Sequence, residues 1–519
     1  MKIDLALCGG MLLDGRGGEA RLADVGIAGD TLVAIADPGT LQADRRFDLS
    51  GHFLAPGFID VHSHSDAYIL IEPSAASKIH QGITTEVVGQ CGASASPLLG
   101  EYKMPSDWRE MEYPGSWSST EEYKALLAEQ QPAVNIATLT GHNTLRAGVM
   151  GYEPRPATLR ERERMQSLLR ESMEAGSRGL STGLLYPPGK HATRDEVVEL
   201  AKVVASFDGI YATHMRNEGE GLLEAIDECI DIARQSGAQL QISHFKTSTP
   251  KAWDLLEPAL ERIARAQAEG IRIHADRYPY LAGCTDLDVL LPDWVFAEGP
   301  AQELAWLNDP VMRATIRDEV IASREPADWQ RVQVGSTHHP DNAPFKGQPI
   351  LSVAEQLGME PVDAILHLIM SDELKTGGIF FGMSEENMWK ILELPYVMLG
   401  SDASLRALNG PLSHDHPHPR AYGSFPRVLR AALDGKTLPL QETIRKMTSL
   451  PAETFHLEKR GVVEEGYKAD LVVFSDLVTD RSTYEKPHAT ATGFKLVLVN
   501  GVMTLIDDEA SHARGGIFL

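Results

Sequence analysis

Residues 210–244 read IYATHMRNEGEGLLEAIDECIDIARQSGAQLQISH, and this stretch decides the fold. A short apolar run at its start predicts a strand that ends at His214, and a second such run ends at His244. Between the two runs, apolar residues from Leu222 to Ala233 recur at helical spacing and stop at Gly237, which is typical of a helix terminus. A strand, a helix and a strand of these lengths predict one unit of a parallel β/α fold.

The same alternation continues on both sides of this unit. Apolar residues at helical spacing in 165–173 precede strand-like residues 179–182, and residues 271–275 show another strand pattern. Thr193 with Glu196 three residues later predicts a capping box at the start of a helix. Only a barrel or a doubly wound sheet accommodates such repeats, and in a barrel the catalytic residues collect at the carboxyl ends of the strands.

The two ends of the chain differ from the middle, because both contain close-set short strands punctuated by Gly, Asp and Asn. We therefore predict a small β-domain formed by residues 1–56 plus 455–519, and a larger domain over residues 57–454. Within the larger domain, prolines break the strand–helix rhythm at about 286–345. We interpret this segment as an insertion that could cover the active site.

Composition limits the partners and the compartment. The 519 residues carry a formal net charge of −25, which argues against nucleic acid or an anionic membrane surface as the main partner. Four cysteines in so long a chain make no disulfide framework. The first ten residues lack the apolar run of a signal peptide, and no run of about 18 apolar residues predicts a spanning helix. We expect a cytoplasmic protein, and we leave open whether it is a homo-oligomer.

Histidines follow several of the predicted strands. In GFIDVHSHSD, residues 57–66, His62 and His64 lie two apart at a strand end, so both side chains point to the same side and can chelate one metal. His214 and His244 each end a strand, one βα unit apart, and are expected to converge on the barrel axis. The alternative is a set of polar residues with independent structural roles.

A cysteine offers a different ligand. Cys91 lies in TTEVVGQCG, residues 84–92, where a strand runs into a turn and the flanking glycines let the backbone expose the thiol. Next to zinc a thiol ionises and becomes a soft ligand able to bridge two metals. The alternative is a buried apolar cysteine, which is our interpretation of Cys229, and we also assign Cys8 and Cys284 structural roles.

An acidic group completes the set of candidates. Asp402 follows an apolar strand in YVMLGSDAS, residues 396–404. A carboxylate beside a metal can take a proton from water and later deliver it to a leaving amine. A turn-forming aspartate is the alternative.

Taken together, the motifs resemble those of the amidohydrolase superfamily. The matching segments are GFIDVHSHSD (57–66), GQCG (89–92), THMR (213–216), SHFK (243–246) and GSD (400–402). The Cys91 region, STGLLYPPG (181–189) and HPHPR (416–420) further resemble the N-acyl-D-amino-acid deacylase, or D-aminoacylase, group. The resemblance covers nearly the whole chain.

This resemblance implies a (β/α)8 TIM-like barrel with a small β-sandwich domain built from both chain ends. It implies one or two zinc ions, with Cys91, His214 and His244 as one position and His62 and His64 as a weaker second one. Many relatives in the wider superfamily use a carboxylated lysine as the bridging ligand, and the resemblance implies that Cys91 takes that role in this chain. Asp402 is implied as acid/base and as a further metal ligand.

The resemblance also implies the substrate, an N-acyl-D-amino acid that is hydrolysed to a carboxylic acid and a free D-amino acid. Its carboxylate is expected at Arg420, with Lys246 and Tyr186 nearby. The loop 403–419 is longer than in the best-known members, so Arg406 could share this role. The alternatives are another amidohydrolase reaction, such as opening of a cyclic amide or cleavage of an isoaspartyl dipeptide, and a non-catalytic barrel that serves as an assembly module.

Overall fold

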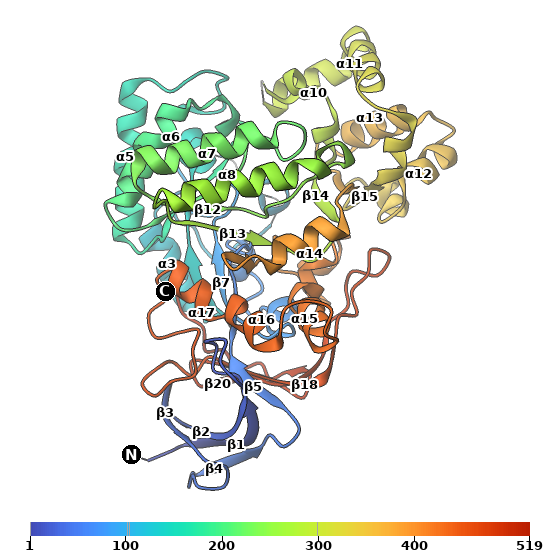
Figure 1. Ribbon diagram of the computed structural model, residues 1–519. Helices are drawn as coiled ribbons and strands as arrows, with labels where there is room; N and C mark the ends of the chain where they lie inside the picture. Colours follow the sequence, from blue (N-terminus) through green and yellow to red (C-terminus); the bar gives the residue numbers. More distant parts are fainter. Residues whose placement is uncertain (1, 101, 103, 110, 298) are drawn as a thin grey trace.

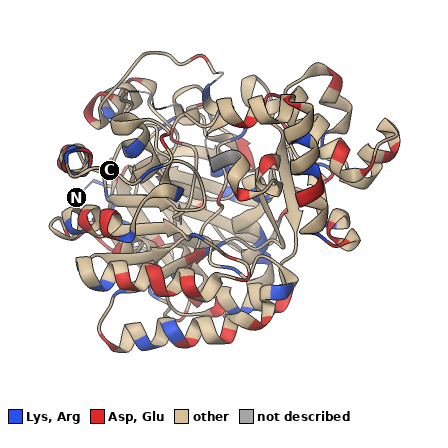
Figure 2. Cartoon of the chain, turned by 90° about the horizontal axis from the view of Figure 1, so that it is seen from above, with Lys and Arg blue, Asp and Glu red and all other residues tan. Residues whose placement is uncertain are grey.

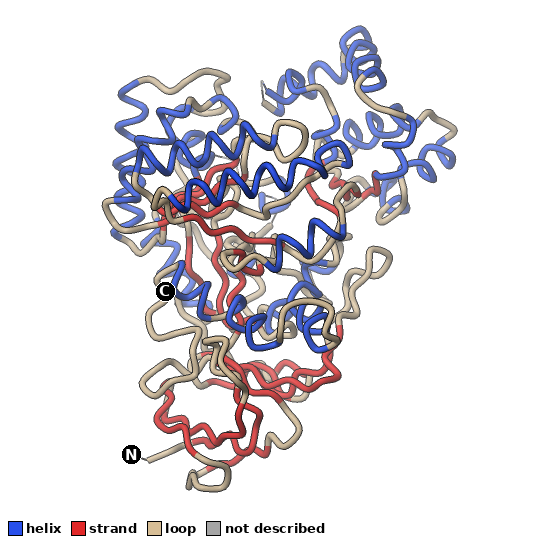
Figure 3. The backbone as a smooth tube through the Cα atoms, viewed as in Figure 1, coloured by secondary structure: helices blue, strands red, loops and turns tan. Residues whose placement is uncertain are grey.

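A computed structural model describes residues 2–100, 102, 104–109, 111–297 and 299–519, and it shows three regions (Figure 1). A strand-rich domain at the bottom of Figure 1 contains the N-terminus and late strands of the chain. A barrel occupies the middle, and a helical lobe, coloured yellow, stands beside its upper end. Figure 3 shows the barrel strands enclosed by helices, whereas the lower domain is made mainly of strands and loops.

The barrel is a ring of parallel strands. In ring order these are β6 (Phe58–Asp60), β7 (Ile83–Val88), β8 (Asn135–Thr138) with β9 (Thr140–Gly141), β10 (Gly179–Gly183), β11 (Ile210–His214), β12 (Gln239–Ile242), β13 (Ile273–Arg277) and β17 (Val397–Leu399). One residue separates β8 from β9, and the two continue each other around the ring because β8 pairs with β7 and β9 with β10. A single parallel bridge between Ser63 and Ala403 joins the last strand to the first. The predicted (β/α)8 barrel is confirmed among the described residues.

Helices form the outer layer. They are α1 (Ala76–Ile79), α2 (Ser106–Arg109), α3 (Thr120–Gln130), α4 (His142–Met150), α5 (Leu159–Glu174), α6 (Arg194–Ala205), α7 (Leu222–Ser236), α8 (Leu256–Ala268), α14 (Glu385–Glu393), α15 (Arg420–Leu433), α16 (Leu440–Met447) and α17 (Ser449–Thr454). The helix predicted to stop at Gly237 does so, with that glycine in the left-handed region at φ 78°. Its apolar face packs against the barrel strands, in one core with α5, α6 and α8.

The predicted capping box at α6 forms only in part. The hydroxyl of Thr193 accepts the backbone N–H of Glu196, as expected. The Glu196 carboxylate, however, is buried and accepts two hydrogen bonds from Arg146, at 2.6 Å each, and lies 2.9 Å from Nε2 of His142. A buried cation on the neighbouring α4 attracts this carboxylate more strongly than the exposed backbone N–H does.

The two ends of the chain form one nine-stranded sheet. Its strands are β1 (Leu5–Leu12), β2 (Arg21–Ala28), β3 (Thr31–Ala36), β4 (Arg45–Asp48), β5 (Phe53–Pro56), β18 (Leu471–Thr479), β19 (Thr492–Val499), β20 (Val502–Ile506) and β21 (Glu509–Ala510). Antiparallel pairing of β5 with β18 joins the early strands to the late ones. Side chains from both halves meet in a single apolar core, so the sheet folds over into the small β-sandwich that we predicted.

The lobe between β13 and β17 has its own core. It contains β14 (Ala282–Asp286), β15 (Val332–Val334), β16 (Gly377–Phe381), α9 (Asp293–Ala297), α10 (Pro300–Asn308), α11 (Pro310–Ala322), α12 (Ile350–Leu357) and α13 (Pro361–Ser371). The three strands form a separate sheet, and an apolar cluster running from Leu287 to Ile369 packs around it. The domain boundaries given above, including an insertion at about 286–345, stay a prediction.

Charged residues of both signs lie along the helices of the outer layer (Figure 2). Seen from above in Figure 2, acidic and basic residues alternate along the outer helices, with acidic positions prominent on several of them. Over the described residues, no helix combines the length and the apolar character needed to cross a membrane.

Candidate metal centre and substrate cavity

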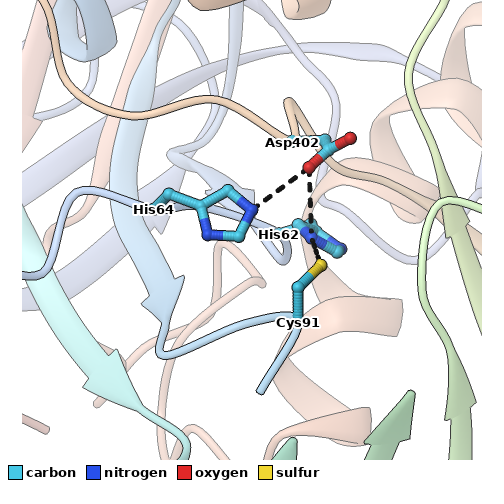
Figure 4. Close-up of side chains that lie close together, drawn as sticks. All are labelled: His62, His64, Cys91 and Asp402. Carbon is cyan, nitrogen blue, oxygen red and sulfur yellow. Dashed lines mark hydrogen bonds and ion pairs between the residues drawn. The ribbon is translucent and has the colours of Figure 1, made fainter. Parts of the chain in front are cut away.

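Six side chains meet at the carboxyl ends of the barrel strands. His62 and His64 follow β6, Cys91 follows β7, His214 ends β11, His244 follows β12 and Asp402 follows β17. Their ligand atoms fall into two groups, each with all atoms within 4.8 Å of one another: His62, His64, Cys91 and Asp402, and then Cys91, His214 and His244. Figure 4 shows the first group, in which one oxygen of Asp402 contacts both histidines and the Cys91 sulfur faces His62. Cys91 belongs to both groups.

The spacing of these atoms fits a metal. Cys91 Sγ lies 3.3 Å from His62 Nε2 and 3.4 Å from His244 Nε2, and Asp402 Oδ1 lies 3.2 Å from His64 Nε2. Two ligands at the usual zinc–nitrogen and zinc–sulfur bond lengths, in tetrahedral geometry, lie about 3.3–3.6 Å apart. His214 Nδ1 lies 2.9 Å from His244 Nε2, so the third side chain of the second group reaches the same point. Nitrogen, sulfur and oxygen atoms at this spacing fit a zinc ion.

Three of the six residues have strained backbones. Cys91, His244 and Asp402 all lie in the left-handed region, at φ 53°, 39° and 51°, which side-chain-bearing residues rarely adopt. At the Cys91 turn, Gly89 has φ 76°, and a Cβ added there would lie 2.1 Å from the Leu139 carbonyl oxygen. Such strain persists only where the surrounding structure enforces it, and it concentrates at functional sites.

Charged residues around the centre favour the ionised forms of Cys91 and Asp402. Burial opposes ionisation of Cys91, yet the neighbouring charges of His62 and His244 hold the pKa of its thiol well below the usual value. Burial likewise opposes ionisation of Asp402, but the Arg420 guanidinium holds the pKa of this carboxyl well below its usual range. The lowered pKa values favour the anionic form of both side chains, which is the form that binds a cation.

Two acidic residues that the sequence patterns did not single out contact the histidines. Asp276, on β13, lies 3.1 Å from His62 Nδ1 and accepts the His244 backbone N–H at 2.9 Å. Glu218 lies 2.9 Å from His244 Nδ1 and 2.6 Å from the Lys246 ammonium. A carboxylate on the second ring nitrogen orients a metal-binding imidazole. Their position at or just after the ends of predicted strands was the available signal.

A cavity of about 1110 Å³ opens onto the centre. It is lined by five of the six candidate ligands and by all four residues predicted to bind substrate, whereas His62 lies fully buried behind them. Residues of the lobe, among them Asp286, Leu290 and Phe380, line it as well. The cavity therefore runs from the strand ends of the barrel to the adjoining lobe.

The four predicted substrate-binding residues already have partners. Arg420 begins α15, and its Nη1 donates to Asp402 Oδ2 at 2.6 Å, while its Nε has no partner. Lys246 binds Glu218, and the Tyr186 hydroxyl lies 3.3 Å from Thr285 Oγ1, with its ring against His214. Arg406 forms an ion pair with Asp415 of its own loop. The structure thus brings Arg420 into contact with the metal centre and pairs Arg406 within the loop.

One further residue of the cavity was missed by the sequence patterns. Tyr278 lines the cavity, and its buried hydroxyl has no hydrogen-bond partner. The guanidinium of Arg420 lies 4.7 Å from the centre of its ring. Tyr278 directly follows β13, and nothing in its local sequence distinguishes it from a core aromatic residue.

Comparison with known proteins shows to which family the chain belongs. The model of the amidohydrolase family matches residues 45–293 and 397–505, which leaves out most of the lobe. The chain belongs to the amidohydrolase family. Among similar proteins, an N-acyl-D-glutamate deacylase from Alcaligenes xylosoxydans xylosoxydans is 35% identical over 99% of this chain and 96% of its own length. A D-aminoacylase from the same organism is 36% identical over 96% of this chain and 93% of its own length.

The fold of this chain is also similar to that of a protein of known structure. The N-acyl-D-glutamate deacylase of Bordetella bronchiseptica, crystallised with zinc and a phosphonate that mimics the tetrahedral intermediate of its reaction, superposes with a TM-score of 0.85. It is 32% identical, and the match covers 100% of both chains. The resemblance to the D-aminoacylase group that the motifs indicated is confirmed.

Proposed function

We propose that this amidohydrolase is a zinc-dependent N-acyl-D-amino-acid deacylase. It hydrolyses the amide bond of its substrate and releases a carboxylic acid and a free D-amino acid. The observation that carries the proposal is Cys91, shared by two groups of metal-ligand side chains at the mouth of a cavity that also presents Arg420 and Lys246. The D configuration and the N-acyl group are proposed from the names of the similar proteins.

We assign one zinc position to Cys91, His214 and His244, and a second, weaker one to His62 and His64 with Cys91 and Asp402. Bound zinc would supply Lewis acidity, which lowers the pKa of water to about 7 and polarises the amide carbonyl. Asp276 and Glu218 support the centre by fixing the rings of His62 and His244.

Asp402 is the proton carrier of the reaction. Its carboxylate takes a proton from the water that attacks the carbonyl carbon, and it delivers the proton to the amide nitrogen as the C–N bond breaks. The attacking oxygen becomes part of the carboxylic acid, and the nitrogen leaves as the amine of the amino acid. Buried within the centre and beside the cavity, Asp402 can reach both positions.

Arg420 binds the α-carboxylate of the substrate. Its Nη1 contacts Asp402, and its unpartnered Nε leaves hydrogen-bonding capacity toward a second carboxylate. We assign Lys246, Tyr186 and the Tyr278 hydroxyl to the walls around the substrate, because each lines the cavity. Arg406 is a secondary candidate, since Asp415 already neutralises it.

A deacylation screen with metal analysis tests the proposal. The substrates are N-acetyl and long-chain N-acyl amino acids in both enantiomers, together with a cyclic amide and an isoaspartyl dipeptide. We expect hydrolysis of N-acyl-D-amino acids by protein that contains zinc. Turnover of only the cyclic amide or the dipeptide would assign another amidohydrolase reaction, and zinc-free, inactive protein would favour the assembly module.

A further inference from the structure

The barrel closes between β17 and β6, and at this seam fewer backbone contacts join the neighbouring strands than elsewhere in the ring. The strands β9 to β13 and β17 form a continuous ladder, and β6 to β8 form another. Between β17 and β6 the backbone contacts among the described residues are few: at the Ser63–Ala403 bridge, the Asp402 N–H donates to the His62 carbonyl at 2.8 Å, and the His64 N–H donates to the Ala403 carbonyl at 3.3 Å. Yet this seam carries three of the four side chains of one ligand group, His62, His64 and Asp402.

A buried lysine lies at this seam. Lys78, in the short helix α1, is fully buried. Its Nζ lies 2.9 Å from Asp60 Oδ2 and 3.0 Å from Glu86 Oε1, and it contacts the Ser401 hydroxyl at 3.1 Å and the Ala403 carbonyl at 3.1 Å. One ammonium thus binds β6, β7 and the segment after β17 at the same time.

Asp60 transmits this contact to the ligands. Its Oδ1 accepts the Ser401 N–H at 2.8 Å and lies 3.3 Å from the His62 N–H, and its Oδ2 accepts the Ser401 hydroxyl at 2.5 Å. One oxygen of Asp60, Oδ1, therefore holds the backbones that carry His62 and Asp402, and Lys78 neutralises this carboxylate at Oδ2. Without that cation, two buried carboxylates would lie close together with no counter-charge.

We propose that Lys78 is a positioning residue that sets the register of β6 against β17 and thereby shapes the metal position of His62, His64 and Asp402. It touches neither substrate nor metal. The position of Cys91, His214 and His244 depends less on it, because regular ladders join β11 to β12 and also join β7, which precedes Cys91, to β8. This inference rests on the metal centre of the proposed function.

The test compares zinc affinities and kinetics of the full-length protein. K78M removes the ammonium, and K78M/E86Q removes one charge of each sign, so that the local net charge is unchanged. S401A makes a milder change in the same network. K446M is the matched control, because Lys446 is also buried but donates to the Leu392 and Leu394 carbonyls on the outer side of the barrel.

Zinc is titrated against a competing chelator up to two equivalents. Altering such a supporting contact typically changes metal affinity or activity about 10- to 100-fold. We expect K78M/E86Q to weaken the second zinc by about 10-fold or more and the first by less than about threefold. At one zinc per chain, kcat should fall with KM within about twofold, because Asp402 is displaced while the substrate cavity is kept. S401A should change both quantities in the same direction by less.

Several results would overturn the proposal. The first is a K78M/E86Q protein with unchanged zinc affinities and unchanged kcat. The second is an equal loss of zinc affinity at both positions. The third is the same change of affinity and kcat in K446M. If the lysine variants do not fold, S401A decides the question: wild-type zinc affinities and a wild-type kcat in S401A would also refute the proposal. Wild-type protein that binds no zinc would instead refute the proposed metal centre.

Discussion

Cys91 and Cys229 place the same side chain in two regions of opposite character. Cys91 lies at the mouth of the barrel with a left-handed backbone, among histidines whose charges lower the pKa of its thiol. Cys229 lies within α7, where its Sγ contacts the Ile226 carbonyl oxygen at 3.2 Å and burial raises the pKa of its thiol. The strand ends of this barrel hold strain and charge, whereas the helical shell is built for packing.

The largest effect is expected at the mouth. Cys91→Ala should abolish activity and lower bound zinc, because the thiolate contributes both charge and a bond to the metal. The measurement is turnover together with zinc content of the same purified sample. Full activity with unchanged zinc would eliminate Cys91 as a ligand.

Asp402→Asn tests whether the carboxylate at the barrel mouth acts as proton carrier or as metal ligand. The amide cannot accept a proton as a carboxylate does, so turnover should fall by about 100-fold or more while the fold is kept. Zinc content separates two roles for this side chain. Retained zinc with lost turnover supports the proton carrier, whereas loss of both in parallel would make Asp402 chiefly a ligand.

Arg420→Lys tests whether the cavity binds a free carboxylate. A lysine ammonium cannot reproduce the planar two-pronged geometry of a guanidinium. We expect kcat/KM to fall by an amount equivalent to about 2–4 kcal/mol, with a raised KM. A fall in kcat alone would instead show that Arg420 acts only through its ion pair with Asp402.

A modified substrate completes this test. Converting the substrate carboxylate to an amide should damage the wild-type enzyme nearly as much, and should add little further loss in the variant. Such non-additivity indicates one shared interaction. If the two losses simply add, Arg420 does not hold the carboxylate, and Arg406 is the next residue to replace.

The sequence predicted what depends on local pattern. Strand ends follow from short apolar runs, so His62, His214 and Asp402 could be placed at the barrel mouth before the structure was known. Repeated helical spacing likewise predicted the shell that contains Cys229. The identity of a family then followed from motifs that all lie on these strand ends.

Contacts across the ring could not be predicted in the same way. Asp276 meets His62, and Lys78 meets Ser401, only because distant strands become neighbours when the barrel closes. The pairing of Arg406 with Asp415 depends on the path of a loop, which has no periodicity to read. Glu196 matched a local capping pattern, but a buried arginine on another helix attracts its carboxylate. Charge pairing in the interior is a tertiary property.

Cys229→Ala should have the smallest effect on catalysis and completes the comparison. Cys229 is 2% exposed and packs in the apolar core shared by α5 to α8 and the strands they cover. Replacing its sulfur by hydrogen leaves a small void and removes one weak hydrogen bond, so the free energy of unfolding should fall by about 1–3 kcal/mol. Nothing at the strand ends changes, and kcat, KM and zinc content should match the wild-type values. Denaturant unfolding beside kinetics on the same preparation measures both. A Cys229→Ala protein that loses its zinc would reverse the roles of the two cysteines, and it would place the metal in the helical shell instead of at the mouth of the barrel.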